Sequence, residues 1–372
     1  MMINKERAAD LFCRLVEIDS PSLGERQMAD FVKAELASLG IACQEDDSAD
    51  KLGGNAGNLM AKVKGNLPGL PLGFAAHTDT VAPACGKRAV RHANGRITSA
   101  GDTVLGADDL TGVAAILEAV RTIKENNLPH RDLELIFPAA EEPYCIGSRQ
   151  MSPDSLQAKE IYVLDLSGPV GLAAVAAPTI LAVEITVIGR ASHAGFAPEE
   201  GIHAIQCAAR ALSRLEFGHV DPDTPVGIGV IAGGKASNIV PGECRLSGEI
   251  RSYSHTRVRE ELEKITRIFT EEAEKIGAEA VIHSEQRTKA FYTDEQSPIV
   301  RRFDRACRAE HISPGYIRTF GGSDGNTFAA WGRQVLVIAN AMNEVHSTKE
   351  WTTAEEIGRI AALTLHLMTD AN

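Results

Sequence analysis

Hydrophobic residues recur along the first half of the chain with two different patterns. Residues 4–19 and the stretch that ends at Gly40 carry apolar side chains every three or four positions, which predicts two amphipathic helices. Short apolar runs that lack this spacing predict buried strands instead. The strands expected from these runs lie at 58–64, 71–76, 133–137 and 161–164, whereas residues 97–103, which include a glycine, are expected to form a short connection. Because strands and helices alternate, we expect an α/β fold with a mixed, largely parallel sheet flanked by helices.

The pattern changes near residue 178. Residues 179–289 read as strand, helix, two strands, a long helix and a last strand, which predicts a small α+β insert of the ferredoxin-like kind. Alternating α/β segments return after residue 290 and end in a helix at about 353–368. We therefore predict a discontinuous larger domain, residues 1–178 and 290–372, interrupted by the insert.

Composition narrows the classes of partner. A chain of 372 residues is too long for one ordinary hydrophobic core, so two domains are expected. The formal net charge of −12 argues against nucleic acid and anionic membranes as the main partners. Seven scattered cysteines without a C-x-x-C motif predict reduced thiols in a cytoplasmic protein. We see neither a signal peptide nor an apolar run long enough to span a membrane, so small molecules and peptides are the expected ligands.

Acidic residues or a histidine follow three of the predicted strands. His77 follows the run 71–76, Glu141 and Glu142 follow 133–137, and Asp165 follows 161–164. In open α/β sheets, binding sites form at the carboxyl ends of the strands. We therefore expect these side chains to lie near one another.

Two further residues extend this set to a possible metal centre. Asp108 precedes a predicted helix, and His346 follows a strand expected at 335–339. Singly, each candidate has an ordinary explanation, such as helix capping by Asp108. Together they form a mixed nitrogen and oxygen set that suits zinc or a similar ion. If one carboxylate bridges, five ligands can hold two ions about 3.5–4 Å apart. The five are His77, Asp108, Glu142, Asp165 and His346.

Two more residues have predicted roles beside these ligands. Asp79 lies two positions after His77, on the same side of an extended strand, and could accept the second ring proton of that histidine. Glu141 and Glu142 would repel each other when ionised, and a nearby cation removes that cost. Glu142 would then bind the metal, and Glu141 would act as the general base toward water.

In this order, these motifs resemble a known family of hydrolases. His77-Thr78-Asp79, Gly106-Ala107-Asp108-Asp109, the Glu141-Glu142 pair, Asp165 and His346 are similar to the dinuclear zinc exopeptidases and deacylases. That family includes peptidase T, carboxypeptidase G2 and the aminoacylases, and the resemblance covers essentially the whole chain. The amino-acid sequence at 105–109 and the glycine-rich turn at 321–325 are most similar to those of peptidase T.

The resemblance implies specific roles for the candidates. Asp108 would bridge two Zn²⁺ ions, with Co²⁺ or Mn²⁺ as alternatives. His77 and Asp165 would complete one site, and Glu142 and His346 the other. The peptide bond between Asp108 and Asp109 would be cis. The insert would serve as a lid and as the contact of a homodimer.

Three residues of the insert also match the family. His193, in Ala191-Ser192-His193-Ala194-Gly195, matches a histidine that stabilises the oxyanion, within one subunit or across the dimer. Arg251 and Asn238 match positions that bind the free carboxylate of the substrate, for which a guanidinium fork is suited. Peptidase T relatives commonly have lysine where this chain has Leu110, which weakens any inference about substrate choice.

The sequence therefore predicts a cytoplasmic two-metal hydrolase that cleaves short peptides, as a tripeptidase does. An amidohydrolase that removes the acyl group from an N-acyl amino acid would use an identical metal site and stays open. A relative that binds a peptide without cleaving it is a third possibility, against which the complete ligand set and Glu141 argue.

Overall fold

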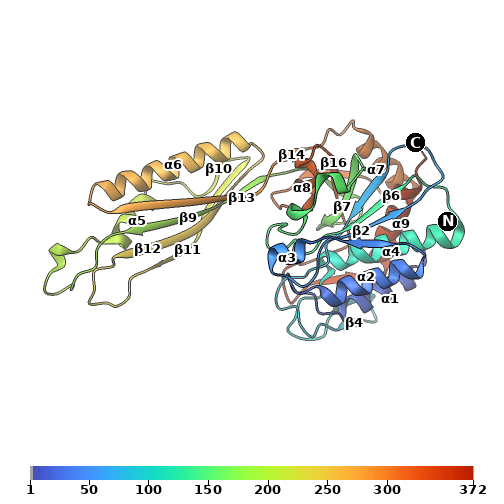
Figure 1. Cartoon of the computed structure of the whole chain (residues 1–372), viewed down its shortest axis with the longest axis horizontal. Coiled ribbons are helices and arrows are strands. Elements are labelled where there is room, and N and C mark those ends of the chain that lie inside the picture. The colour runs from blue at the N-terminus through green and yellow to red at the C-terminus, as the bar shows by residue number, and fades with distance from the viewer. Residues whose placement is uncertain (1–2, 372) are drawn as a thin grey trace. The chain divides into compact units, whose positions relative to one another are not determined.

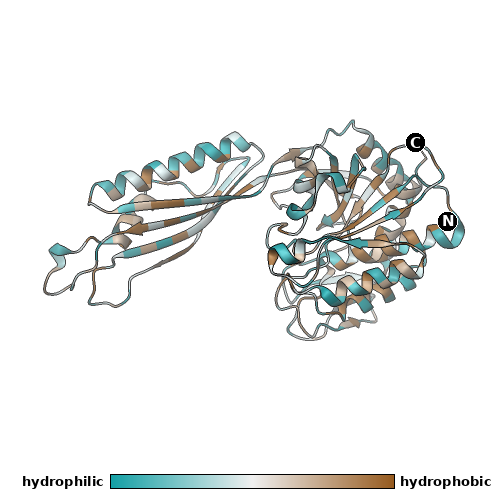
Figure 2. Cartoon of the chain, in the orientation of Figure 1, coloured by the Kyte–Doolittle hydropathy of each residue, from teal (hydrophilic) through white to brown (hydrophobic). Residues whose placement is uncertain are grey.

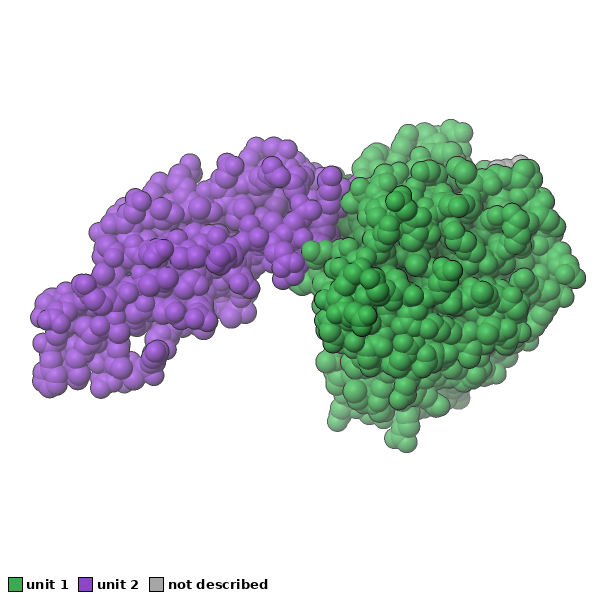
Figure 3. All heavy atoms as spheres, in the orientation of Figure 1, with its two compact units in different colours: residues 1–176, 292–319, 323–372 green, residues 177–291, 320–322 purple. Residues whose placement is uncertain are grey.

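The computed structural model describes residues 3–371, and the chain divides into two compact units (Figures 1 and 3). Unit 1 comprises the residues up to Ala176, Tyr292–Thr319 and the residues from Ser323 onward. Unit 2 comprises Ala177–Phe291 and the short segment Phe320–Gly322. Each unit has its own cluster of buried hydrophobic side chains, so each is stabilised by a core of its own.

A mixed sheet forms the centre of unit 1. Its middle strands β6, β3, β7 and β16 run parallel, whereas β2 pairs antiparallel with β6, and β8 antiparallel with β16. The carboxyl ends of the four parallel strands therefore meet at one edge of the sheet. In spatial order the strands are β1 (Cys43–Glu45), β2 (Leu59–Val63), β6 (Leu133–Phe137), β3 (Leu72–Ala75), β7 (Glu160–Leu166), β16 (Gln334–Ala339), β8 (Leu172–Ala177) and β14 (Phe291–Tyr292), with β15 (Gly315–Arg318) beside β8.

Helices cover this sheet and complete its core. The almost fully buried α4 (Ala107–Asn126) packs against α1 (Lys5–Val16) and α9 (Ala354–Thr369). Gly112 lets α4 approach β7 closely, because an added Cβ would lie 2.8 Å from the carbonyl oxygen of Leu164. The remaining α-helices of unit 1 are α2 (Arg26–Ser38), α3 (Ser48–Leu52), α7 (Pro298–Ala309) and α8 (Asp324–Ala330). Within residues 3–371, no helix is both long and apolar enough to cross a membrane.

One sequence-based expectation for unit 1 is wrong. The segment 97–103 was expected to be a plain connection, but β5 (Arg96–Ser99) is a strand between β4 (Ala89–Arg91) and β17 (Trp351–Thr353). The pairing explains the difference, since β17 lies about 250 residues later in the chain and leaves no local trace in the sequence.

Unit 2 is an antiparallel sheet with two helices, α5 (Ala204–Leu212) and α6 (His255–Glu274), packed against it. Figure 2 shows the polar stripe of α6, whose apolar side chains, including Val258, Ile265 and Phe269, belong to the core of the unit. The helix starts at the N-cap Ser254. The strands are, in order, β10 (Gly218–Asp221), β11 (Thr224–Gly233), β12 (Glu243–Ser252), β9 (Thr179–Ile188) and β13 (Glu279–Thr288). The extra short strand β10 distinguishes the unit from the predicted β-α-β-β-α-β order.

The far half of β11 is an open edge. The register of β10 against β11 ends at Val226, and beyond it no described strand pairs with the outer side of β11. A register shift falls between Ile228 and Val230. Val230 and Ile231 are 58% and 53% exposed. Such an apolar edge with unpaired backbone groups is a template for pairing with another strand.

The segment Phe320–Gly322 is held by unit 2 although its neighbours in the chain belong to unit 1. The ring of Phe320 lies 5.4 Å from that of His219 and 4.9 Å from that of Tyr253. Arg251 Nη1 donates a 2.7 Å hydrogen bond to the carbonyl oxygen of Phe320. The chain therefore crosses between the units at four points rather than two.

Candidate active site

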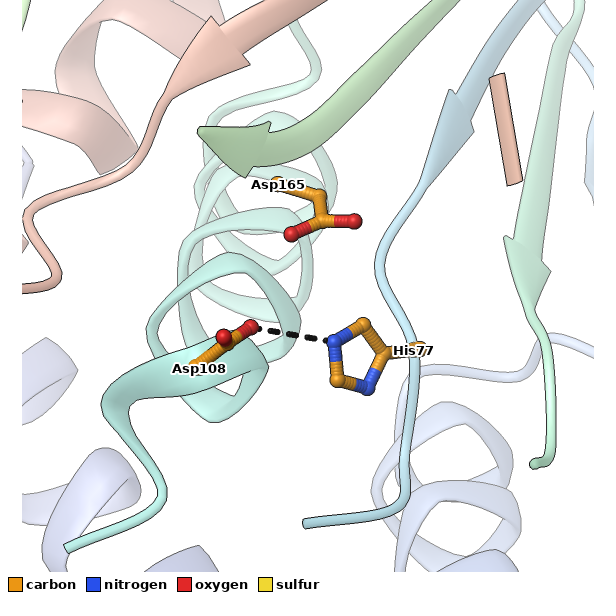
Figure 4. A group of neighbouring side chains, drawn as sticks. All are labelled: His77, Asp108 and Asp165. Carbon is orange, nitrogen blue, oxygen red and sulfur yellow. Dashed lines mark hydrogen bonds and ion pairs between the residues drawn. The ribbon is translucent and has the colours of Figure 1, made fainter. Parts of the chain in front are cut away.

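The five predicted metal ligands converge in unit 1. They form two groups that share Asp108: His77, Asp108 and Asp165, drawn in Figure 4, and Asp108, Glu142 and His346. Within each group, one nitrogen or oxygen atom of every residue lies within 4.8 Å of the others. The side chains meet because β3, β6, β7 and β16 end at the same edge of the sheet, where α4 also begins. Asp165 is the next-to-last residue of β7 rather than a residue after it, since the strand extends to Leu166.

Asp108 lies between the two histidines. Its Oδ1 is 3.1 Å from Nε2 of His77, and its Oδ2 is 3.2 Å from Nε2 of His346. The same nitrogen of His346 is 3.1 Å from Oε2 of Glu142. Each carboxylate oxygen of Asp108 thus faces a different histidine, as is expected of a ligand that bridges two ions.

The charges of the site favour a cation. Burial and neighbouring carboxylates raise the pKa of Asp165 well above its usual value, and burial raises that of Glu142. Hydrogen bonds to Asp108 and Glu142 raise the pKa of His346 to about 11. Glu142 Oε1 is buried, and no described group forms a hydrogen bond with it. Clustered carboxylates, two histidines and an unsatisfied oxygen fit a pair of divalent metal ions.

Asp79 organises the loop that carries the two glutamates. Its Oδ1 accepts a 2.9 Å hydrogen bond from the backbone N–H of Glu141, and its Oδ2 accepts one of 3.2 Å from that of Glu142. Ser22 Oγ donates to the same Oδ2 at 2.6 Å. Toward His77, the backbone oxygen of Asp79 lies 3.0 Å from Nδ1, closer than its carboxylate oxygen at 3.4 Å. Asp79 therefore contacts the histidine through two groups, and its carboxylate also orients both glutamates.

Hydrogen bonds to buried carboxylates hold the loop that carries Asp108. The peptide bond between Asp108 and Asp109 is cis, as predicted. Asp109 is fully buried, and its Oδ2 accepts a 3.0 Å hydrogen bond from the backbone N–H of His77. Glu350 accepts from Gly106 N at 2.7 Å and from Asp108 N at 2.9 Å. Burial raises the pKa of Glu350 to about 7.

The loop of Glu141 is fixed by two residues that the sequence analysis also missed. Glu25 is fully buried, and its Oε1 accepts hydrogen bonds of 2.9 Å from the backbone N–H groups of Leu23 and Ala140. Asn58 accepts from Ala139 N and donates to the carbonyl oxygen of Gly147, so it holds both ends of the loop. No local signal in the sequence marks either residue, because Glu25 lies 115 positions before Ala140 and Asn58 lies 81 positions before Ala139.

The remaining predicted residues lie in unit 2. The segments of His193 and Asn238 are joined, because Ala194 N donates a 2.9 Å hydrogen bond to the carbonyl oxygen of Asn238. His193 Nδ1 accepts from the backbone N–H groups of Gly195 and Phe196, at 3.1 and 3.2 Å. Arg251 is partnered by Glu249, through a 2.7 Å hydrogen bond, as well as by Phe320. The structure thus groups His193 with Asn238 but places Arg251 beside the crossing segment.

Comparisons with known proteins agree with this geometry. The model of "Peptidase family M28" matches residues 58–173, and that of the "Peptidase dimerisation domain" matches residues 175–277. The structure of a tripeptidase from Staphylococcus aureus superposes with a TM-score of 0.96 at 32% identity, over 99% of both chains. That of aminopeptidase PepT from Bacillus cereus superposes with a TM-score of 0.93 at 32% identity, over 100% of both. The chain belongs to the peptidase T-like metallopeptidase family.

Membership of this family confirms the resemblance drawn from the sequence. The protein YqjE of Bacillus subtilis, which is uncharacterized, is 33% identical over the full length of both chains. The chain is a hydrolytic enzyme of the peptidase T-like family, and its mixed sheet with an α+β insert is the fold of that family, as predicted.

Proposed function

We propose that unit 1 is the catalytic domain and hydrolyses the peptide bonds of short peptides with two divalent metal ions. The observation that supports this most directly is the position of Asp108, whose two oxygens face His77 on one side and His346 on the other. His77, Asp108 and Asp165 would hold one ion, and Asp108, Glu142 and His346 the other. Zinc suits this mixture of imidazole and carboxylate donors, and Co²⁺ or Mn²⁺ could replace it. When bound, the ions supply Lewis acidity toward water and toward the substrate carbonyl.

Glu141 is proposed as the general base. It is only 8% exposed, and its backbone N–H is fixed by Asp79. Burial, followed by the charge of Asp165, raises the pKa of Glu141 well above its usual value. A carboxylate with a raised pKa accepts a proton from water more readily and can later donate it to the leaving amine.

His193 is proposed as the donor to the oxyanion. Two backbone N–H groups point at its Nδ1, so that nitrogen must accept, and the proton of the neutral ring resides on Nε2. Nε2–H is therefore available to donate to the negative charge that develops on the carbonyl oxygen. This tautomer is the same whether His193 acts in its own subunit or in a partner.

The proposed substrate is a tripeptide or another short peptide with a free carboxylate. The two structural relatives at 32% identity are a tripeptidase and an aminopeptidase, which supports this class. Arg251 and Asn238 are the proposed carboxylate ligands. Arg251 would add the substrate to its present partners, Glu249 and Phe320, which the five donors of a guanidinium allow.

Unit 2 is proposed as the lid and as the contact of a homodimer. The match of residues 175–277 to the peptidase dimerisation domain supports this assembly. The open edge of β11, with Val230 and Ile231 exposed, offers the surface for it. A cytoplasmic location is proposed because all seven cysteines are free, including exposed Cys85.

Two experiments test the proposed function. Glu141→Gln should reduce hydrolysis of a tripeptide such as trialanine to a small residual rate while the metal content stays at two ions per chain. Loss of metal together with activity would instead make Glu141 a structural element of the site. A panel of tripeptides against N-acetyl amino acids tests the substrate class, and cleavage of the N-acetyl amino acids alone would replace the peptidase by a deacylase.

A further inference from the structure

The loop after the proposed base has an unusual backbone. Ala140, Tyr144 and Cys145 have φ angles of 48°, 67° and 56°, in the left-handed region that side chains with a Cβ disfavour. The backbone N–H of Cys145 donates a 2.5 Å hydrogen bond to the carbonyl oxygen of Glu141, which closes a tight turn. This turn directs the side chain of Cys145 back toward that of Glu141.

The thiol of Cys145 contacts the carboxylate of the proposed base. Its Sγ lies 3.1 Å from Oε1 of Glu141, within hydrogen-bond distance for sulfur. An ionised carboxylate can only accept, so the thiol must be the donor. Cys145 is 1% exposed, and burial and the charge of Glu141 raise its thiol pKa well above the usual value, so the group stays protonated.

A second carboxylate also interacts with this thiol. Asp324, the first residue of α8, is 2% exposed, and its side chain interacts with those of Ser148 and Cys145. Its Oδ1 is buried, and no described group forms a hydrogen bond with it. The charge of Asp324 repels that of Glu141 and contributes to its raised pKa, and the thiol of Cys145 interacts with both carboxylates.

We propose that Cys145 is a positioning residue for Glu141. Its S–H holds Oε1 of the base, so that Oε2 is the oxygen left to face water and substrate. The inference rests on the proposed role of Glu141 as the base. The simpler alternative is that Cys145 only fills volume in the core, as buried cysteines commonly do.

Three substitutions separate the two roles. Cys145→Ser keeps a hydrogen-bond donor, Cys145→Val keeps bulk without a donor, and Cys145→Ala removes both. With the zinc-loaded enzyme and a tripeptide, Cys145→Ser should keep kcat within about twofold. Cys145→Val and Cys145→Ala should lower kcat roughly tenfold, with KM within about twofold. A misplaced base stabilises the transition state less but does not change how tightly the substrate binds. Metal content and Tm, measured on the same samples, confirm that each variant is folded and loaded.

Contrary results have distinct meanings. Unchanged kcat in Cys145→Val, or an equal loss in Cys145→Ser and Cys145→Val, would overturn the positioning role. Glu141→Gln measured in parallel tests the premise, since a fully active Glu141→Gln enzyme would reject the base itself. In the Glu141→Gln background, Cys145→Val should cause no further loss of residual activity, because Cys145 acts only through Glu141. An additive loss would show that Cys145 acts elsewhere.

Discussion

The carboxylate of Glu350 accepts a 2.9 Å hydrogen bond from the backbone N–H of Asp108, although the two residues are 242 positions apart in the chain. With its other oxygen Glu350 holds the backbone N–H of Gly106. Substituting alanine would leave two buried N–H groups unsatisfied and free the loop that presents the shared ligand. We expect Glu350→Ala to weaken metal binding about 10–100-fold, measured by competition with a chelator. Glu355→Gln, at an exposed ion pair with Lys5, is the matched control and should bind metal as the wild type does.

His346 allows the two metal positions to be told apart. It contacts only the group that contains Glu142, whereas His77 and Asp165 belong to the other. His346→Ala should therefore leave about one ion per chain, against two in the wild type, by elemental analysis of the dialysed protein. His92→Ala, at a histidine bound to Thr98 away from the site, should retain both ions. Loss of both ions in His346→Ala would mean that the positions fill only together.

Asp79 supports the site without belonging to either group of ligands. Removing its carboxylate frees the backbone N–H groups of Glu141 and Glu142 and weakens the support of His77. Asp79→Ala should lower metal affinity about 10–100-fold and reduce kcat, yet the site should still fill at saturating zinc. An Asp79→Ala protein that takes up no metal at any zinc concentration would make Asp79 a direct ligand. Asp47→Ala, at an exposed helix pair with Lys51, is the control.

Glu25 gives a pH dependence of stability to the metal-free protein. Burial and the charge of Asp79 raise its pKa to about 7, from an ordinary value of 4.5. Between these values the folded state binds more protons than the unfolded state, so this residue's contribution to stability falls as the pH rises from 4.5 to 7. Glu25→Gln keeps the acceptor for Leu23 and Ala140 but cannot ionise.

The variant and the wild type should therefore diverge with pH. Above pH 7, metal-free Glu25→Gln should be more stable than the wild type by up to about 3 kcal/mol, and the difference should vanish near pH 4.5. Urea unfolding of both proteins across this range measures it. A constant difference at all pH values would show that Glu25 does not titrate in this window.

If the proposed homodimer forms through the open edge of β11, a single substitution on that edge should break it. A charged side chain on an exposed edge strand opposes pairing with a second strand. Ile231→Lys should shift the protein toward monomer in sedimentation velocity. Leu70→Lys changes a similarly exposed apolar residue of unit 1, away from β11, and should not shift it. If Ile231→Lys leaves a dimer intact, the contact lies on another surface of unit 2.

The clustering of the proposed metal ligands could be predicted because sequence and topology agree about these residues. His77 follows β3, the Glu141–Glu142 pair follows β6 and Asp165 lies at the end of β7, so a parallel sheet must bring them together. The residues that support them could not be predicted. Glu350 reaches Asp108 across most of the chain, and Cys145 reaches Glu141 only through a left-handed turn formed by non-glycine residues. Neither hydrophobic periodicity nor local propensity records such contacts.

The four crossings between the units limit how this architecture can be rearranged. Removing Ala177–Phe291 would not excise unit 2 cleanly, because Phe320 would lose the rings of His219 and Tyr253 that surround it. Gly322 also packs closely against unit 2, since an added Cβ there would lie 2.9 Å from Cγ2 of Thr288. Exchange of unit 2 between relatives, by recombination or by engineering, therefore has to carry Phe320–Gly322 along with it. Ala177–Phe291 and the segment Phe320–Gly322 therefore form one exchangeable piece.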